Sequence, residues 1–248
     1  MKKRLDELLV ERALAPDVKS AAALIMAGVV MGRGKILDKP GLALDESVML
    51  KLKERPAYVS RGGDKLASVA AELGLIFSGQ LVLDVGASTG GFADFALQHG
   101  AVRVYCVDVG NAQLDWRLRQ DGRVVVMERT DIRAAQLPEL VDIALVDVSF
   151  ISLQRVLPAV SCHLSAGGTI VAMAKPQFEA PKAIADRFKG VIDDELVRAE
   201  ILQQFETKVQ ESFVILGQAD SKVPGARGNV ERFYVLVRNS TTSPSRMT

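Results

Sequence analysis

A glycine-rich turn in the stretch LVLDVGASTGGFADFAL (residues 81–97) has the residue types and spacing of a binding site. The stretch predicts a buried strand, a tight turn over residues 86–91 and the beginning of a helix. Asp84 and Asp94 flank the turn. Glycines let the backbone come close to a bound group, and a helix N-terminus attracts anions. The turn therefore predicts a site for a phosphate, a nicotinamide dinucleotide or another cofactor.

The spacing of the glycines separates these alternatives. The dinucleotide fingerprint is G-x-G-x-x-G, and its second glycine lets the backbone approach the pyrophosphate. The turn here reads GASTGG and lacks that glycine. The pattern D-x-G-x-x-x-G, beginning at Asp84, is closer to the first motif of S-adenosylmethionine-dependent methyltransferases. In that motif the glycines admit the methionine and ribose, and an acid can serve the amino group.

Two further acids follow the next strands. Asp108, 22 residues after Gly86, can accept both ribose hydroxyls, and Asp131 in ERTDIR can meet the adenine edge. The alternative is a structural turn with incidental acids, but three acids at successive strand ends favour the cofactor. The residues expected to bind S-adenosylmethionine are Asp84, Gly86, Ala87, Ser88, Thr89, Gly90, Gly91, Phe92, Asp108, Val109, Thr130, Asp131 and Ile132.

Alternating strands and helices must position these residues. Apolar strands are expected at 81–86, 102–110, 124–128, 142–150 and 167–175, with helices over 63–74, 91–99, 153–164 and 193–211. Such strands predict a parallel sheet covered on both faces. The last two strands, 213–217 and 231–237, are joined by a short loop and predict an antiparallel hairpin. We expect an α/β fold, a Rossmann-like methyltransferase sheet with one antiparallel strand.

The amino-terminal part has a different pattern of predicted helices and strands. Helices are expected over 4–14 and 18–27, the second capped by Asp17, with short strands at 29–31 and 48–52. We expect a small α+β domain and its linker over residues 1–59, a second domain over 60–239 and a disordered tail over 240–248.

Composition limits the class of protein. The chain has 248 residues, of which 48% are hydrophobic and 25% charged, as in globular domains. It contains neither an apolar run long enough to span a membrane nor a signal peptide, so we expect a cytoplasmic protein. The two cysteines and two histidines have no ligand spacing, and no metal is expected. Residues 1–59 carry 11 Lys or Arg against 8 Asp or Glu, a small excess that suits a polyanion.

Four stretches, LDVGASTGGF, YVSRGGDKL, VDVSFISL and AKPQFE, closely resemble the TlyA (hemolysin A) family. The resemblance covers nearly the whole chain. It implies a ribosomal-protein-type (S-four) RNA-binding domain joined to an FtsJ-like ribosomal RNA methyltransferase. It also implies methylation of a ribose 2′-hydroxyl, usually of a cytidine, with ribosomal RNA or ribosomal subunits as partners.

The resemblance also implies a catalytic Lys-Asp-Lys-Glu tetrad. Its members match Lys65 in GGDKL, Asp147 in LVDVSF, Lys175 in AKPQF and Glu231 in GNVER. A ribose hydroxyl must lose its proton before it attacks a sulfonium methyl, so the enzyme needs positioning and a base rather than a metal. Lys175 would be the base, and the carboxylates would orient it and the ribose.

The RNA-binding domain is expected to supply basic groups to structured RNA. The candidates are Lys2, Lys3, Arg4, Lys19, Arg33 and Lys35, together with Arg61 near the active site. Phe178 either stacks on a flipped target base or belongs to the core, and the core is preferred. The chain departs from the family pattern after PQFEA, where PKAIADRFKGVIDD replaces a glycine-rich segment, and at the turn GRGK.

Three other classes of function remain as alternatives. The chain could be a non-catalytic RNA-binding factor in ribosome assembly, although the intact tetrad argues against this. A membrane-active hemolysin is disfavoured because no apolar span or amphipathic basic stretch is present. A nicotinamide-dependent enzyme requires a pyrophosphate site at the turn. The sequence leaves the oligomeric state and the modified nucleotide open.

Overall fold

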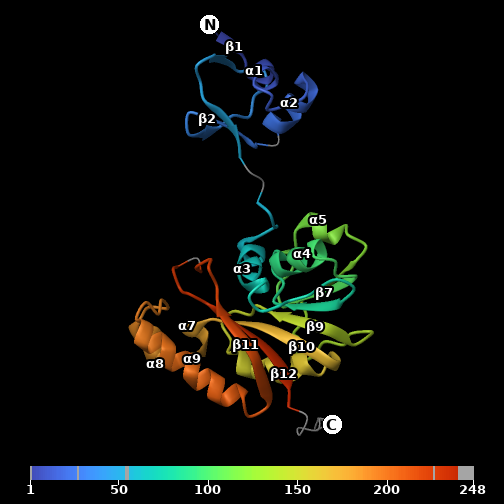
Figure 1. The fold of residues 1–248 in the computed structure, drawn as a ribbon, viewed down its shortest axis with the longest axis vertical. Coiled ribbons are helices and arrows are strands. Elements are labelled where there is room, and N and C mark those ends of the chain that lie inside the picture. Colours follow the sequence, from blue (N-terminus) through green and yellow to red (C-terminus); the bar gives the residue numbers. More distant parts are fainter. Residues whose placement is uncertain (1, 27, 54–55, 226, 240–248) are drawn as a thin grey trace. The chain divides into compact units, whose positions relative to one another are not determined.

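The computed structural model describes residues 2–26, 28–53, 56–225 and 227–239. The chain divides into two compact units, Met1–Pro56 and Ala57–Thr248 (Figure 1). The division lies near the end of residues 1–59, the range that the sequence analysis assigns to the first domain and its linker. The expected disordered tail, 240–248, lies outside the described residues.

The first unit is a small α+β domain. Its elements are β1 (Lys2–Arg4), α1 (Leu5–Glu11), α2 (Val18–Met26), β2 (Val30–Gly32), β3 (Lys35–Ile36), β4 (Ala43–Asp45) and β5 (Leu50–Leu52). Strands β1 and β4 pair antiparallel, and β3-β2-β5 form a second sheet. Asp17 accepts a hydrogen bond from the Ser20 N–H (2.7 Å), which confirms the expected cap of α2. Leucines at helical spacing in α1, among them Leu5 and Leu9, pack into the core.

The second unit is built on one seven-stranded sheet. Its strands are β6 (Leu81–Val85), β7 (Arg103–Asp108), β8 (Val124–Glu128), β9 (Val141–Val146), β10 (Leu164–Ala174), β11 (Phe213–Asp220) and β12 (Arg232–Arg238). Their order is β11-β12-β10-β9-β6-β7-β8. Strands β8, β7, β6, β9 and β10 are parallel, and β12 is antiparallel to both its neighbours. The expected sheet and its antiparallel strand are confirmed.

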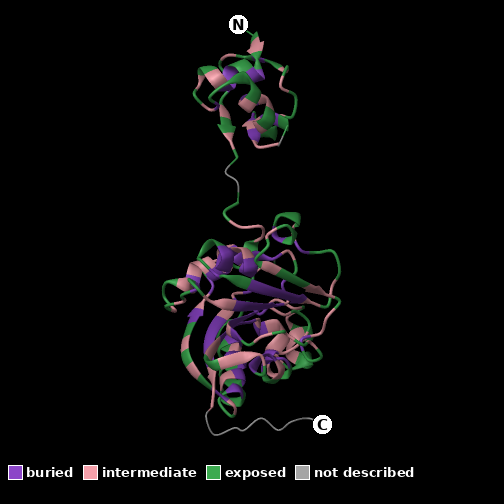
Figure 2. Cartoon of the chain, turned by 90° about the vertical axis from the view of Figure 1, so that its right-hand side faces the viewer, coloured by how far each residue is buried: buried purple, intermediate pink, exposed green. Residues whose placement is uncertain are grey.

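Helices cover both faces of this sheet (Figure 1). One face packs against α3 (Arg61–Ala70), α4 (Gly91–Gln98) and α5 (Trp116–Arg119). The other packs against η1 (Leu153–Arg155), α6 (Leu157–Ser161) and α9 (Glu195–Val209). Between β10 and α9 lie the short helices α7 (Pro176–Glu179) and α8 (Lys182–Arg187). The central strands β6, β7 and β9 are buried along most of their length (Figure 2), because both faces are covered there, whereas the edge strands β8 and β11 are more exposed.

The helix expected over 153–164 is wrong in extent. A 3₁₀ turn, η1, precedes α6, and β10 already begins at Leu164. Pro158 accounts for the division, because proline is suited to the first turn of a helix and ill suited to its interior.

Candidate active site

The glycine turn after β6 lies where the carboxyl ends of the parallel strands meet. Gly86 has φ +80°, and a Cβ at this position would lie 2.5 Å from the Asp147 carbonyl oxygen and 3.3 Å from the Val148 Cα. Gly90 has φ +94° and lies against Leu118. Both positions therefore favour glycine, since a side chain would be strained at either, and at Gly86 it would also push the loop after β9 away from the turn.

Beside this turn is a cavity of about 390 Å³. Seven of the residues expected to bind the cofactor line it: Gly86, Ser88, Asp108, Val109, Thr130, Asp131 and Ile132. Residues from the loop after β9 complete the wall, namely Asp147, Val148, Ser149, Phe150 and Ile151. The wall thus combines apolar surface with carboxylates at strand ends, which suits a nucleoside with a diol and an amino group.

Asp108 is held in one orientation at the end of β7. Its Oδ2 accepts the Ser88 N–H (2.8 Å), and its Oδ1 accepts the Gly110 N–H (2.6 Å). A carboxylate has about four lone-pair sites, so each oxygen can accept one further hydrogen bond. The arrangement suits the expected contact with two vicinal hydroxyls.

Asp131 is paired with Arg133, whose Nη2 lies 2.5 Å from its Oδ2. Hydrogen bonds from the Arg133 side chain and backbone lower the pKa of Asp131 to about 2. The carboxylate is therefore ionised at neutral pH and remains an acceptor on the cavity wall.

Asp84 lies beneath the turn rather than on the cavity wall. Its side chain is buried, and its Oδ2 accepts the Ala93 N–H at the beginning of α4 (3.0 Å). Its Oδ1 has no hydrogen-bond partner among the described residues. Burial, followed by the nearby charge of Asp147, raises the pKa of Asp84 to about 8. The acid expected to meet the amino group is therefore largely protonated at neutral pH.

The other expected cofactor residues lie in the turn and at the beginning of α4, away from the cavity wall. They are Ala87, Thr89, Gly90, Gly91 and Phe92, none of which lines the cavity. Phe92 is buried in the core, with its ring 5.8 Å from that of Phe233.

The four residues of the expected tetrad form two ion pairs. Lys65 Nζ on α3 lies 2.9 Å from Glu231 Oε1, just before β12. Lys175 Nζ, after β10, lies 2.5 Å from Asp147 Oδ1, and it also donates to Ser149 Oγ (2.8 Å). The lysine and glutamate side chains are mostly buried. Three of the four side chains thus come from strand ends, and the fourth comes from the helix before the first strand of the sheet.

A second cavity, of about 560 Å³, adjoins this edge. Its lining residues are Phe150, Gln177, Phe178, Ala185, Asp186, Lys189, Gly190, Gly225, Arg227, Asn229 and Glu231. Phe150 lines both cavities. Two cations, Lys189 and Arg227, and two acids, Asp186 and Glu231, lie on its wall, so the cavity offers charged groups of both signs to a ligand.

Sequence reasoning missed Phe150. Its side chain is 91% exposed and its φ is +64°, an unfavourable backbone conformation for an aromatic residue. Its ring lies 5.1 Å from that of Phe178, which is half-buried on the cavity wall instead of in a core cluster. The aromatic after VDVS was the only available signal, because a positive φ cannot be read from sequence.

The cations expected to bind RNA differ in their surroundings. Lys3 is paired with Glu11 (2.7 Å), and Arg4 with Asp6 (2.6 Å). Arg61, on the second unit, donates to the Pro224 carbonyl. Four make no ion pair with any residue the structure describes: Lys2, Lys19, Arg33 and Lys35.

Comparisons with known proteins agree with this geometry. Residues 58–239 match the family of FtsJ-like methyltransferases. A Bacillus subtilis protein named as a candidate rRNA methyltransferase, YqxC, is 43% identical over 93% of this chain and 84% of its own length. The 16S/23S rRNA (cytidine-2′-O)-methyltransferase TlyA of Mycobacterium tuberculosis is 41% identical over 94% of this chain and 89% of its own.

A solved structure from Streptococcus thermophilus, described as a candidate hemolysin, has a TM-score of 0.71 and 38% identity. The match covers 100% of this chain and 92% of the other. Among the described residues, no helix combines the length and the apolar character needed to cross a membrane. The match to the family spans residues 58–239, a range that includes the cofactor turn and the positions of the tetrad. The chain belongs to the family of FtsJ-like methyltransferases.

Proposed function

We propose that this chain transfers a methyl group from S-adenosylmethionine to the 2′-hydroxyl of a cytidine in ribosomal RNA. The methyl donor follows from membership of the methyltransferase family. The RNA and the cytidine are inferred from the names of the relatives that match over most of the chain.

One observation carries the proposal. The cavity lined by Asp108 and Asp131 and the cavity lined by Glu231 share Phe150. The Asp147–Lys175 pair lies at the loops that form this junction. Two ligand sites that meet at a lysine and its orienting carboxylate are suited to the transfer of a group from one ligand to the other.

The chemistry divides between the donor and the chain. S-adenosylmethionine supplies a methyl group made electrophilic by its sulfonium. The Lys175 ammonium first gives a proton to solvent, and its neutral amine then accepts the proton of the 2′-hydroxyl as the O–CH₃ bond forms and the S–CH₃ bond breaks. Asp147 Oδ1 and Ser149 Oγ fix the direction of that amine. Glu231 and Lys65 orient the ribose, and their contact holds each side chain in place.

Phe150 and Phe178 are positioned to hold the target base. Proteins that bind unpaired nucleotides stack the exposed bases on aromatic rings, which hold the nucleotide and its ribose in one position. The two rings border the second cavity, and Lys175 Nζ lies 5.9 Å from the centroid of Phe178. The first unit supplies cations for the surrounding RNA, with Lys2, Lys19, Arg33 and Lys35 as the unpaired candidates.

Mutation of Lys175 tests the proposal. Lys175→Ala is expected to abolish 2′-O-methylation of ribosomal subunits isolated from cells that lack this protein, because no other group accepts the proton. Lys175→Arg keeps the positive charge but cannot act as a base, and it is expected to be equally inactive. Mass spectrometry of the RNA would locate the methylated nucleotide.

The outcome also separates the enzyme from a non-catalytic assembly factor. If the wild-type chain bound subunits but left every 2′-hydroxyl unmodified, the proposed function would be wrong. If Lys175→Ala methylated as fast as the wild type, the assignment of the base would be wrong.

A further inference from the structure

Asn229 forms a bridge between two loops that border the second cavity. Its side chain is buried, and both ends of its amide are used. Nδ2 donates to the Gly190 carbonyl (2.9 Å), and Oδ1 accepts the Ile192 N–H (2.8 Å). The side chain thereby ties the turn before β12 to the segment after α8, and buried polar groups are satisfied on both sides.

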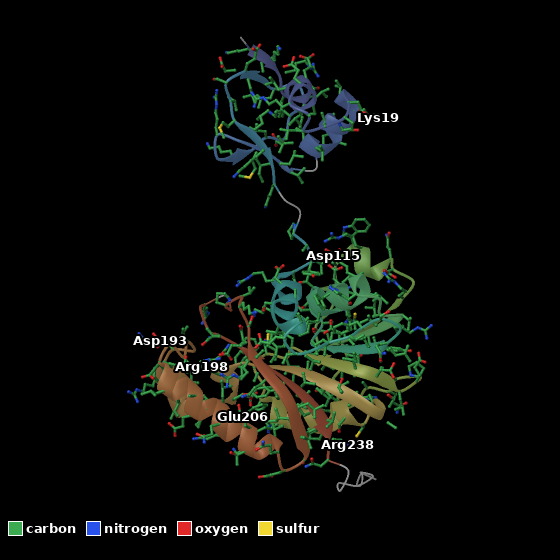
Figure 3. The ribbon with its side chains drawn as sticks, viewed as in Figure 1. Lys19, Asp115, Asp193, Arg198, Glu206 and Arg238 are labelled. Atoms are coloured by element: carbon green, nitrogen blue, oxygen red, sulfur yellow. The ribbon has the colours of Figure 1, made fainter. Side chains whose placement is uncertain are left out.

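The same turn is fixed by two more contacts. The Gly225 N–H donates to the Asn229 carbonyl (2.8 Å), which closes the turn. Arg198 Nε donates to the Val230 carbonyl (3.1 Å). Arg198 lies on α9 (Figure 3), is buried, and is itself held by Asp220 (2.7 Å). The backbone before Glu231 is therefore anchored to two other parts of the fold.

This anchoring bears directly on the carboxylate of Glu231. A Cβ on Gly225 would lie 2.6 Å from Glu231 Oε1, so the turn packs against the carboxylate itself. The same Oε1 contacts Lys65 Nζ, and Oε2 has no hydrogen-bond partner among the residues described. A shift of the turn would therefore move the carboxylate relative to Lys65.

We propose that Asn229 is a positioning residue for methyl transfer, which holds Glu231 on Lys65 and sets the wall of the substrate cavity. The inference rests on the proposed function. Neither Asn229, Gly190 nor Gly225 lines the donor cavity, whereas all three line the second cavity. Loss of the bridge is thus expected to affect transfer and RNA placement while the donor site stays intact.

The test compares Asn229→Ala with Asp142→Ala in the full chain. Asp142 also bridges two segments, accepting hydrogen bonds from the Leu81 N–H (2.9 Å) and Ser165 Oγ (3.1 Å). It lies at the amino-terminal ends of the strands, away from both cavities of the proposed site. Asn229→Ala is expected to lower kcat on isolated ribosomal subunits roughly 10- to 100-fold, because small misplacements of orienting groups are costly.

Three other measurements define the outcome. In Asn229→Ala, calorimetry with S-adenosylhomocysteine should give an unchanged donor affinity, and Ile192 should show faster amide hydrogen exchange. Asp142→Ala should lower the melting temperature and leave kcat unchanged. An equal loss of kcat in both variants, a parallel loss of donor affinity, or unchanged exchange at Ile192 would overturn the inference.

The exchange measurement needs no substrate. It tests the bridge even if the wild-type chain transfers no methyl group, a result that would count against the proposed function. If the Ile192 amide exchanged as slowly in Asn229→Ala as in the wild type, the Asn229 side chain would not anchor this segment in the wild type, whatever the activity.

Discussion

At the scale of the residue, the candidate site gathers carboxylates whose environments differ. Asp131 is ionised beside Arg133, which lowers its pKa to about 2. Asp84 is buried near Asp147 and Asp108, and its pKa is raised to about 8. A neutral Asp84 relieves the repulsion among the acids below the glycine turn.

Asp84→Asn tests this assignment. The pKa of Asp84 is about 8 when folded, against an ordinary value of 3.8, so between those values the folded chain holds a proton that the unfolded chain releases. The free energy of unfolding of the wild type should therefore fall as pH rises, by up to about 1.4 kcal/mol per pH unit. The asparagine is neutral at every pH and should remove that part of the slope, as measured by urea unfolding.

The size of the difference should grow as the pH rises to about 8 and stay constant above it, with the variant the more stable chain there. Both chains would show parallel pH dependence if Asp84 were ionised in the fold, and that result would refute the assignment. Asp142→Asn, a change at the other edge of the sheet, serves as the control.

At the scale of the element, three side chains on one face of α3 contact the loop between β11 and β12. Arg61 donates to the Pro224 carbonyl, Lys65 contacts Glu231, and Ser68 Oγ accepts the Lys222 N–H (3.2 Å). The spacing of four and three residues places these side chains on one face of the helix. Lys65 therefore lies on a helix whose preceding and following turns also make hydrogen bonds with this loop.

Gly91→Ala tests the packing of α4 against α3. A Cβ on Gly91 would lie 2.7 Å from the Gly63 nitrogen and 3.1 Å from the Gly62 Cα, which are backbone atoms that cannot move aside separately. We expect a loss of about 1–3 kcal/mol in the free energy of unfolding. Weaker binding of S-adenosylhomocysteine should accompany it, because α4 begins at the cofactor turn.

Gly122→Ala is the matched control for Gly91→Ala. No atom lies within 4 Å of a Cβ built at Gly122. The stability and donor affinity of Gly122→Ala should equal those of the wild type. If Gly91→Ala behaved in the same way, α3 and α4 could separate without a loss of stability.

The sequence predicted the elements with strong periodicity and two of the short strands, β2 and β5, but it missed other short elements. Strand β8 has the expected bounds, 124–128, because an unbroken apolar run is flanked by polar residues. Strands β1 and β4 were missed, since each has three residues and exists only through the pairing of Lys2 with Asp45 and its neighbours. Local patterns carry no information about such long-range pairing.

The same limit applies to the candidate site. The tetrad positions were found by resemblance, but their division into two ion pairs depends on where helix α3 meets the loop before β12. The bridge made by Asn229 depends on tertiary contacts with Gly190 and Ile192. An asparagine after a glycine reads as an ordinary turn, so nothing in the sequence distinguished it.

At the scale of the whole molecule, charge separates the two units. Residues 1–59 hold a net positive charge, although Lys3 and Arg4 are paired with acids of the same unit. Lys19, Arg33 and Lys35 are exposed and make no ion pair with a described residue (Lys19 is labelled in Figure 3). Cations without an ion pair bind phosphates without first losing an internal partner, so these three, like Lys2, are better candidates for RNA contacts than Lys3 and Arg4.

Replacement of Lys19, Arg33 and Lys35 by alanine tests the role of the first unit. Removal of each cation that binds a phosphate should reduce the salt slope of binding by roughly one, so the slope of the triple variant should fall by up to about three. Affinity for ribosomal subunits should fall most at low salt, while the affinity for S-adenosylhomocysteine should be unchanged. Arg103→Ala, which removes a cation paired with Glu139 (2.8 Å) on the second unit, is the control. An unchanged salt slope in the triple variant would mean that other groups hold the RNA.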